Sequence, residues 1–368
     1  MAADATPHAP PRSLEPAPLA GAPAPGAGGD GDKGNGTAAS TALPGRARVS
    51  RNADVVQTWA SLIALGVLVV VFAAISPQFR TLGNLQQIID AAAVLAVLAT
   101  GITFVLLLGA IDLSLPGVIG ACAMTVSLLV ANSRNDNDLG LLGVGLTIGL
   151  GAMFGLLSGV LSTRLRIPTF MTTLGMSAIG IGIATILFGG SRPVVLDENL
   201  NAWATSRIGG FTLMSLIAVA AVATGWAIQR WTRVGRYAAA IGGGEDIVAL
   251  SGVSVARYKA LAFGVAGAFY GLGAVMVTAR LGSGVVEAGA GLDFAAITAA
   301  VIGGTLLSGG RGGVLQSMIG VVALTVLANG LILTGVSPYV QQAVQGVIVV
   351  LAVAVAVWPV RHRLGVVK

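Results

Sequence analysis

Few side chains in this sequence have the types and spacing that covalent or metal chemistry requires. Its one cysteine, Cys122, lies inside an apolar run, and its two histidines, His8 and His362, lie near the two ends. Such a set cannot form the Cys and His cluster of a zinc site. The sequence also lacks a Gly-x4-Gly-Lys-Ser/Thr loop, the common cradle for the phosphates of ATP. We therefore expect neither an enzyme active site nor a metal or other cofactor in this chain.

The residues that could bind a solute are polar side chains within or beside apolar runs. Asp112 and Asp293 each stand at the start of such a run. A charge near the centre of a bilayer costs about 2.5–3.5 kcal/mol, so the retention of either carboxylate needs a physical reason. Capping of the following helix, with Ser114 assisting Asp112, is the interpretation that we favour. A place on a solute pathway is the alternative.

Four neutral residues are further candidates. Thr169, Thr172 and Thr173 follow Pro168, which suits the first turn of a helix, and Asn329 lies inside a later apolar run. Their polar groups either bond within and between helices, which we favour, or bind a polar solute. The candidate pathway residues are therefore Asp112, Ser114, Thr169, Thr172, Thr173, Asp293 and Asn329.

Composition places these residues in a membrane protein. The 368 residues are 55% hydrophobic and only 10% charged, whereas soluble domains average about 25% charged residues. Mean hydropathy is +0.87. The net charge of +6 comes from residues scattered through short loops rather than clustered with aromatic side chains. We therefore expect membrane lipid around the chain and no nucleic-acid partner.

The apolar runs predict an all-α integral membrane protein with about ten transmembrane helices, some of them short or broken. The expected spans are 58–75, 88–108, 115–131, 139–162, 168–188, 211–228, 260–279, 293–307, 314–334 and 340–359. The eighth is too short to cross a bilayer comfortably and is followed by the glycine-rich turn Gly309-Gly-Arg-Gly312. Such an interruption indicates backbone that leaves the helix at membrane depth, usually beside a pathway, so transport is the favoured function.

An even number of spans puts both termini on one side, and basic residues indicate which side. With both termini cytoplasmic, fourteen basic residues lie in the inner segments from residue 46 onward and five in the outer ones. The inner ones are Arg46, Arg48, Arg51, Arg164, Arg166, Arg230, Arg233, Arg236, Arg257, Lys259, Arg311, Arg361, Arg363 and Lys368; the outer ones are Arg80, Arg134, Arg192, Arg207 and Arg280. This imbalance predicts that the N- and C-termini are cytoplasmic.

Glycine and proline divide the rest of the chain. Residues 1–50 are rich in Ala, Pro and Gly, which predicts a disordered cytoplasmic tail before a transmembrane domain over 55–360. Two stripes, Gly151-x3-Gly155-x3-Gly159 and Gly264-x2-Gly267-x3-Gly271, predict helices that approach closely, with a subunit contact as a further possibility.

The cytoplasmic loop 230–259 holds a short helix in this interpretation. Gly242–Gly244 break the preceding helix, and Glu245 and Asp246 start a new one, where acidic groups suit the positive end of the helix dipole. Residues 247–250 give it apolar surface, and Gly252 can end it. A helix of two turns is unstable alone, so either the bundle or a separate partner must hold it.

The stretch Gly243-Gly-Glu-Asp-x4-Ser-Gly252 resembles the coupling segment of bacterial ABC permeases for monosaccharides of the ribose, xylose and arabinose type. Further stretches match this family in the same order over roughly residues 55–360. They are Gly109-Ala-Ile-Asp-Leu-Ser114, Ile167-Pro-Thr-Phe-Met-Thr-Thr-Leu-Gly175, Gly289-Ala-Gly-Leu-Asp293, Ala300-Val-Ile-Gly-Gly-Thr305 with Gly309-Gly-Arg-Gly312, and Asn329-Gly-Leu-x3-Gly-Val-Ser337.

The resemblance implies a non-enzymatic permease subunit in the bacterial inner membrane that moves a monosaccharide or similar small polar solute into the cytoplasm. The implied partners are cytoplasmic ABC ATPase subunits that bind the ATP, a periplasmic or lipid-anchored solute-binding protein, and a second permease subunit in a homodimer or heterodimer. The ATPase-coupling helix would comprise Gly243, Gly244, Glu245, Asp246, Leu250, Ser251 and Gly252. Two alternatives stay open: a self-contained ion-coupled carrier, and a permease of a related importer for branched-chain amino acids or nucleosides.

Overall fold

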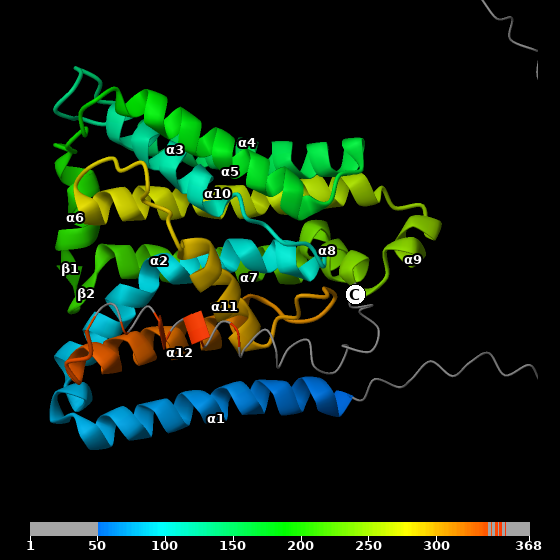
Figure 1. The fold of residues 1–368 in the computed structure, drawn as a ribbon, viewed down its shortest axis with the longest axis horizontal. Coiled ribbons are helices and arrows are strands. Elements are labelled where there is room, and N and C mark those ends of the chain that lie inside the picture. Colours follow the sequence, from blue (N-terminus) through cyan, green and yellow to red (C-terminus); the bar gives the residue numbers. More distant parts are fainter. Residues whose placement is uncertain (1–50, 338–339, 341–342, 345, 348–349, 351–368) are drawn as a thin grey trace, which may run out of the picture. The chain divides into compact units, whose positions relative to one another are not determined.

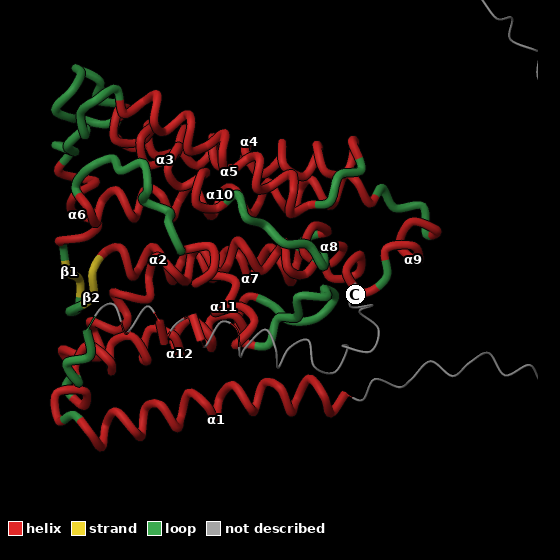
Figure 2. The backbone as a smooth tube through the Cα atoms, viewed as in Figure 1, coloured by secondary structure: helices red, strands yellow, loops and turns green. Residues whose placement is uncertain are grey.

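A computed structural model describes residues 51–337 together with 340, 343–344, 346–347 and 350, with side chains from residue 61 onward. The expected tail over 1–50 and most of the tenth expected span, 340–359, lie outside the described residues. The described part is almost entirely helical (Figures 1 and 2). This confirms the all-α expectation for that part of the chain.

Nine of the expected spans are helices. They are α1 (Arg51–Ile75), α2 (Leu82–Leu107), α3 (Leu115–Leu129), α4 (Gly140–Leu165), α5 (Thr169–Phe188), α7 (Leu213–Trp231), α10 (Val255–Leu281), α11 (Leu292–Gly303) and α12 (Val314–Leu333). Between them lie a 3-10 turn, η1 (Pro77–Arg80), and three shorter helices, α6 (Glu198–Thr205), α8 (Arg233–Gly243) and α9 (Glu245–Leu250). A two-residue hairpin, β1 (Arg207–Ile208) with β2 (Phe211–Thr212), pairs Arg207 with Thr212.

Within the described residues, six helices are long and apolar enough to cross a membrane: α2, α4, α5, α7, α10 and α12. Two of them form the centre of the bundle, because α2 and α10 are 72% and 78% buried over their most apolar stretch. The corresponding figures for α4, α5 and α7 are only 22% to 33%, as befits helices that face lipid on one side. The apolar helices α3 and α11 are shorter.

The short elements mark the two ends of the bundle. The pieces α6, β1 and β2 lie at one end, and α9 projects from the other (Figure 1). We call these the α6 end and the α9 end. The connection 189–210 contains α6 and most of the hairpin, although its sequence shows no apolar periodicity that would predict either element.

The two glycine stripes face each other inside this one chain. Gly155 on α4 lies so close to α10 that a Cβ atom would stand 2.8 Å from the carbonyl carbon of Phe263 and 3.1 Å from the amide nitrogen of Gly267. A Cβ on Gly271 would stand 2.9 Å from the Cα of Ile148. The predicted close packing is therefore confirmed, and it joins α4 to the central helix α10.

This packing predicts a contrast between two alanine substitutions on α4. Gly155→Ala adds a methyl group that must push α10 away, and overpacking of this kind costs about 1–3 kcal/mol of unfolding free energy. Gly149→Ala is the matched control, because nothing lies within 4 Å of its Cβ position. We expect Gly155→Ala to lower the thermal unfolding midpoint of the detergent-purified chain and Gly149→Ala to leave it unchanged or raise it. Equal midpoints for the two variants would contradict the packing.

Candidate solute pathway and coupling site

The chain is interrupted between α2 and α3, and Asp112 lies in this interruption. Asp112 is completely buried. Its Oδ1 accepts hydrogen bonds from the backbone N–H of Ser114 at 2.9 Å and from the Ser114 hydroxyl at 2.6 Å. Its Oδ2 accepts one from the hydroxyl of Tyr270, on α10, at 3.1 Å. The favoured capping role needs correction, because Ser114 occupies the cap position of α3 but its side chain caps no helical N–H.

Two polar side chains of α5 hold the start of α3. The Thr173 hydroxyl oxygen accepts a hydrogen bond from the backbone N–H of Leu113 at 3.0 Å, and Ser177 accepts one from the N–H of Gly117 at 3.3 Å. Thr173 also donates to the carbonyl of Phe170 within α5. Thr172 makes a single long bond, of 3.5 Å, to the carbonyl of Pro168. Of the three expected threonines, Thr173 therefore belongs to the buried polar cluster around Asp112.

Asp293, from a distant part of the sequence, reaches the same cluster. It is 5% exposed and lies close enough to Asp112 for the two carboxyl groups to interact electrostatically. The segment before it packs tightly on α3, since a Cβ on Gly289 would stand 2.7 Å from the Cα of Pro116. Gly291, rather than Asp293, occupies the cap position of α11, so the expected cap is wrong by two residues. Among the described residues, Asp293 Oδ1 has no hydrogen-bond partner.

A second interruption, residues 304–313, separates α11 from α12. The eighth expected span ends four residues early, because Gly304 adopts a left-handed conformation with φ of 109°. The backbone of this interruption is hydrogen-bonded within the protein. The N–H of Thr305 donates to the carbonyl of Ala300, and the N–H of Gly310 donates to the carbonyl of Leu107. Thr305 in turn accepts from the N–H of Gly313. Internal bonds of this kind are what irregular backbone at membrane depth requires.

Gln229, near the end of α7, completes the second interruption. Its Oε1 accepts a hydrogen bond from the backbone N–H of Val314 at 2.8 Å, and its Nε2 donates to the carbonyl of Gly312 at 3.3 Å. One amide side chain thus satisfies a backbone donor and a backbone acceptor at the start of α12.

Both interruptions meet the end of α8 at a contact that we call the glycine junction, formed by Gly109, Gly242, Gly243, Gly309 and Gly310. A Cβ on Gly309 would stand 2.7 Å from the Cα of Gly109 and 2.9 Å from the Cα of Gly242. A Cβ on Gly310 would stand 2.8 Å from the Cα of Gly243. Only glycine permits three backbones to approach this closely. The junction links the helix before α9 to both interruptions.

The short helix expected within residues 230–259 is present as α9, and its first residue forms an ion pair. The Lys259 ammonium lies 2.7 Å from Glu245 Oε2 and joins α9 to the start of α10. The break before α9 is shorter than expected: Gly242 and Gly243 lie within α8, and Gly244 alone separates the helices. Ser251 and Gly252 follow the last turn, with Gly252 left-handed at φ of 77°. Asp246 lies in the first turn of α9, as predicted.

A cavity of about 700 Å³ lies at the α9 end and brings two expected groups of residues together. Thr169, from the threonine group, lines it beside Glu245 and Lys259. Ser162 and Arg166, near the end of α4, complete its polar wall. The helix α9 thus borders a cavity that also touches Gly109, at the start of the first interruption.

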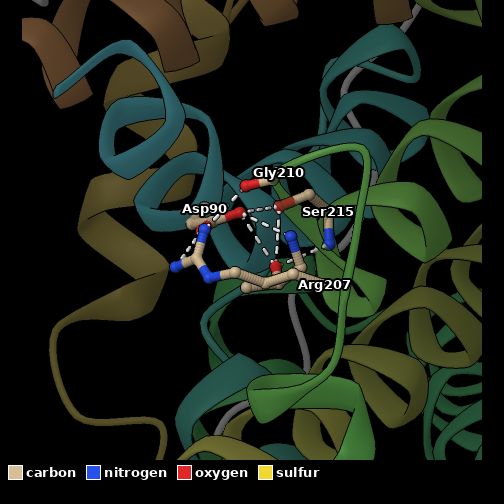
Figure 3. A network of polar contacts seen from close by, with 5 residues as sticks. Asp90, Arg207, Gly210 and Ser215 are labelled. Carbon is tan, nitrogen blue, oxygen red and sulfur yellow. Dashed lines mark hydrogen bonds and ion pairs between the residues drawn. The ribbon is translucent and has the colours of Figure 1, made fainter. Parts of the chain in front are cut away.

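The last expected residue, Asn329, lies apart from this cluster, towards the α6 end. Its Nδ2 donates to Asn84 Oδ1 at 2.9 Å, which is the favoured bond between helices, here α12 and α2. Asn329 also lines a second cavity, of about 410 Å³. Near it, Asp90 accepts hydrogen bonds from Thr212 and Ser215 and pairs with Arg207 at 3.1 Å (Figure 3).

Three residues that form these sites were not predicted from the sequence: Tyr270, Gln229 and Lys259. Tyr270 binds an aspartate 158 residues earlier in the chain, and Gln229 binds backbone 83 and 85 residues later. No local pattern carries such pairings. Lys259 was predicted only as a basic residue of the loop. Its ion pair with Glu245 was not predicted, because the turn between the two residues cannot be derived from the sequence.

The glycine junction predicts a contrast between adjacent residues of α8. In Gly242→Ala the added Cβ would stand 2.5 Å from the amide nitrogen of Gly310, so α8 and the second interruption must separate. Gly243→Ala is the matched control, because nothing lies within 4 Å of its Cβ position. We expect a lower thermal unfolding midpoint for the detergent-purified Gly242→Ala chain only. A midpoint for Gly242→Ala equal to that of Gly243→Ala would contradict the junction.

Comparisons with known proteins place the chain in a family. Residues 84–353 match the family described as the permease component of branched-chain amino acid transport systems. The ribose import permease RbsC of Escherichia coli K12 is 35% identical over 304 residues, which cover 80% of this chain and 92% of that protein. The galactose/methyl galactoside import permease MglC of Haemophilus influenzae is 31% identical over 309 residues, covering 80% and 91%. No solved structure matches the chain. The chain therefore belongs to this family of transport-system permeases, as a multi-pass membrane protein.

Proposed function

We propose that the chain is the permease subunit of an ATP-driven (ABC) importer and moves a monosaccharide or similar small polar solute into the bacterial cytoplasm. The observation that carries this proposal is the 35% identity to a ribose import permease over 92% of that protein. A permease named for galactose import is 31% identical, so relatives for two different sugars support the solute class. Neither name distinguishes between individual sugars for this chain.

The proposed orientation in the bacterial inner membrane puts the α6 end outside and the α9 end in the cytoplasm. Arg164, Arg230 and Arg233 lie in or beside helix ends at the α9 end, where the charge rule expects an excess of basic residues. In this proposal residues 340–359 form a tenth span, and both termini are cytoplasmic.

The proposed docking surface for a cytoplasmic ABC ATPase is α9. Its side chains Ile247 and Leu250 are 61% and 89% exposed, while Val248 packs into the bundle. Large apolar side chains that project from the end of a membrane protein mark contact surfaces. Val248 and the Glu245–Lys259 ion pair attach α9 to the bundle, so a push on its exposed face would reach α10.

The glycine junction gives such a push a route to the interior. It joins α8, the helix before the docking surface, to both interruptions, and the first of these contains the buried Asp112. We propose that ATP-driven motion of α9 shifts both interruptions together and rocks the bundle between inward-open and outward-open states. The solute then moves past Asp112, Ser114, Thr173 and Asp293, with a second permease subunit and a periplasmic or lipid-anchored binding protein completing the importer.

The alternatives differ from this proposal in their energy source or cargo. An ion-coupled carrier needs an intramembrane carboxylate that exchanges a cation, and Asp293 has an unbonded oxygen among the described residues. Both oxygens of Asp112, however, accept hydrogen bonds from the chain itself. A related importer for branched-chain amino acids or nucleosides would use the same coupling route with different cargo.

The proposal is tested by purifying the tagged chain from its native host in a gentle detergent and identifying co-purified proteins by mass spectrometry. We expect an ATPase with a phosphate-binding loop and a solute-binding protein. Reproducible isolation of the chain without any ATPase would contradict the proposal.

The docking surface predicts that Leu250→Glu abolishes co-purification of the ATPase, because a charge replaces the most exposed apolar side chain of α9. Leu165→Glu is the matched control: Leu165 is 60% exposed at the last residue of α4, at the same end of the bundle but outside α9. We expect this control to retain the ATPase. If the Leu250→Glu chain also retains the ATPase, α9 is not the docking surface.

The coupling role predicts that Glu245→Arg, or proline at any of residues 247–250, abolishes solute uptake while the protein still inserts into the membrane. Glu245→Arg places two cations side by side at Lys259, and proline disrupts a helix of six residues. Uptake of labelled solute by cells and the amount of chain in membrane fractions are the two measurements. Normal uptake by either variant would contradict the coupling role.

A further inference from the structure

The cavity of about 410 Å³ towards the α6 end has the lining of a small-molecule site. Its polar residues are Gln87 and Asp90 on α2, Arg207 on β1, Thr212 on β2, Arg280 on α10, and Thr325 and Asn329 on α12. Apolar side chains make up the rest of the wall, among them Ala91, Met214, Ala328 and Leu333. The volume falls within the range of about 300–1,000 Å³ that ligand pockets occupy.

Several polar groups in this cavity have unused hydrogen-bonding capacity. Asn329 spends its amide nitrogen on Asn84, but its buried Oδ1 has no partner among the described residues. The side chains of Gln87 and Arg280 also line the cavity, and among the described residues neither takes part in a hydrogen bond or an ion pair. Buried polar atoms are nearly always bonded in native proteins, so a bound molecule would supply the missing partner of Asn329 Oδ1. Gln87 and Arg280 are exposed, and their side chains can donate to the same molecule.

The part of the cavity wall around Asp90 is held in place by hydrogen bonds and an ion pair. Asp90 accepts hydrogen bonds from the Thr212 hydroxyl at 2.9 Å and from the Ser215 hydroxyl, and it pairs with Arg207 (Figure 3). Arg207 in turn donates to the carbonyl of Gly210 at 2.7 Å. These bonds tie α2 to the start of α7 and hold the wall in one conformation. A preformed wall lowers the entropy cost of binding.

We propose that this cavity binds the transported solute as a neutral polyhydroxylated molecule of monosaccharide size, a statement that rests on the proposed function. Asn329 Oδ1 accepts a hydroxyl proton, Gln87 and Arg280 donate to hydroxyl oxygens, and the small apolar side chains cover the C–H face of the ring. A free amino acid would need a carboxylate for its ammonium group. The charge of the Asp90 carboxylate is already paired with Arg207, and its Oδ1 already accepts hydrogen bonds from Thr212 and Ser215, although among the described residues its Oδ2 accepts no hydrogen bond.

The first test measures protection of an engineered cysteine. The native Cys122 is completely buried, so it contributes little background to labelling with a polar thiol reagent. Ala328→Cys puts a thiol in the cavity wall, and Val322→Cys, on an exposed position of the same helix outside the cavity, is the control. Labelling rates are compared in the detergent-purified complex with ribose, galactose, leucine or no addition.

Binding predicts that ribose or galactose slows labelling of Ala328→Cys about tenfold once its concentration is about ten times the dissociation constant, because occupancy follows mass action. Labelling of Val322→Cys stays unchanged. If neither sugar slows labelling at Ala328→Cys up to molar concentration, the proposal is overturned. If leucine protects and the sugars do not, the solute class is overturned.

The second test blocks the cavity. Ala328→Phe fills it without removing a polar group, whereas Val322→Phe adds the same side chain elsewhere on α12. We expect at least about a tenfold loss of ATP-dependent sugar uptake in Ala328→Phe only, with the ATPase still co-purified, since an occluded site cannot hold its ligand. Equal uptake by both variants contradicts the cavity site. If the wild-type complex imports sugar while both tests fail, the cavity assignment falls and the proposed function stands.

Discussion

The structure depends on one constraint of the bilayer: backbone that leaves a helix in hydrocarbon must find its hydrogen-bond partners inside the protein. The interruption at 304–313 meets this constraint with the carbonyls of Ala300 and Leu107 and with the side chains of Thr305 and Gln229. At the first interruption, Asp112 and Thr173 accept the N–H groups of Ser114 and Leu113. These bonds allow the short helices α3 and α11 to begin or end inside the bundle.

Glycine makes the same arrangement compact enough to act as one mechanical unit. The backbones at Gly109, Gly242 and Gly309 touch because none carries a side chain. Packed protein is poorly compressible, so a displacement at one of these backbones is transmitted to the others. The helix α9 begins two residues after Gly243, and Asp112 lies three residues after Gly109. The proposed docking surface and the proposed pathway are therefore connected through this contact.

The sequence predicted the helices well because apolar runs of bilayer length have few other structures open to them. It also predicted α9 from the acidic residues 245–246 and the glycines around them. It failed where the deciding partner is distant. Asp112 looks like a cap from its neighbours, and only the fold reveals its hydrogen bond to Tyr270 and its electrostatic interaction with Asp293. The elements in 189–210 were missed because polar loop segments carry no periodic signal, and Gly242 was placed in a break because its packing partners were unknown.

In the proposed mechanism, ATP hydrolysed by a partner subunit drives solute through this chain. The most direct measurement is uptake of labelled ribose and galactose into proteoliposomes that contain the purified complex, its binding protein and either ATP or a proton or sodium gradient. We expect uptake that requires ATP on the side of the ATPase and proceeds with no ion gradient. Uptake by the chain alone, driven by an ion gradient and indifferent to ATP, would contradict this mechanism and establish a carrier.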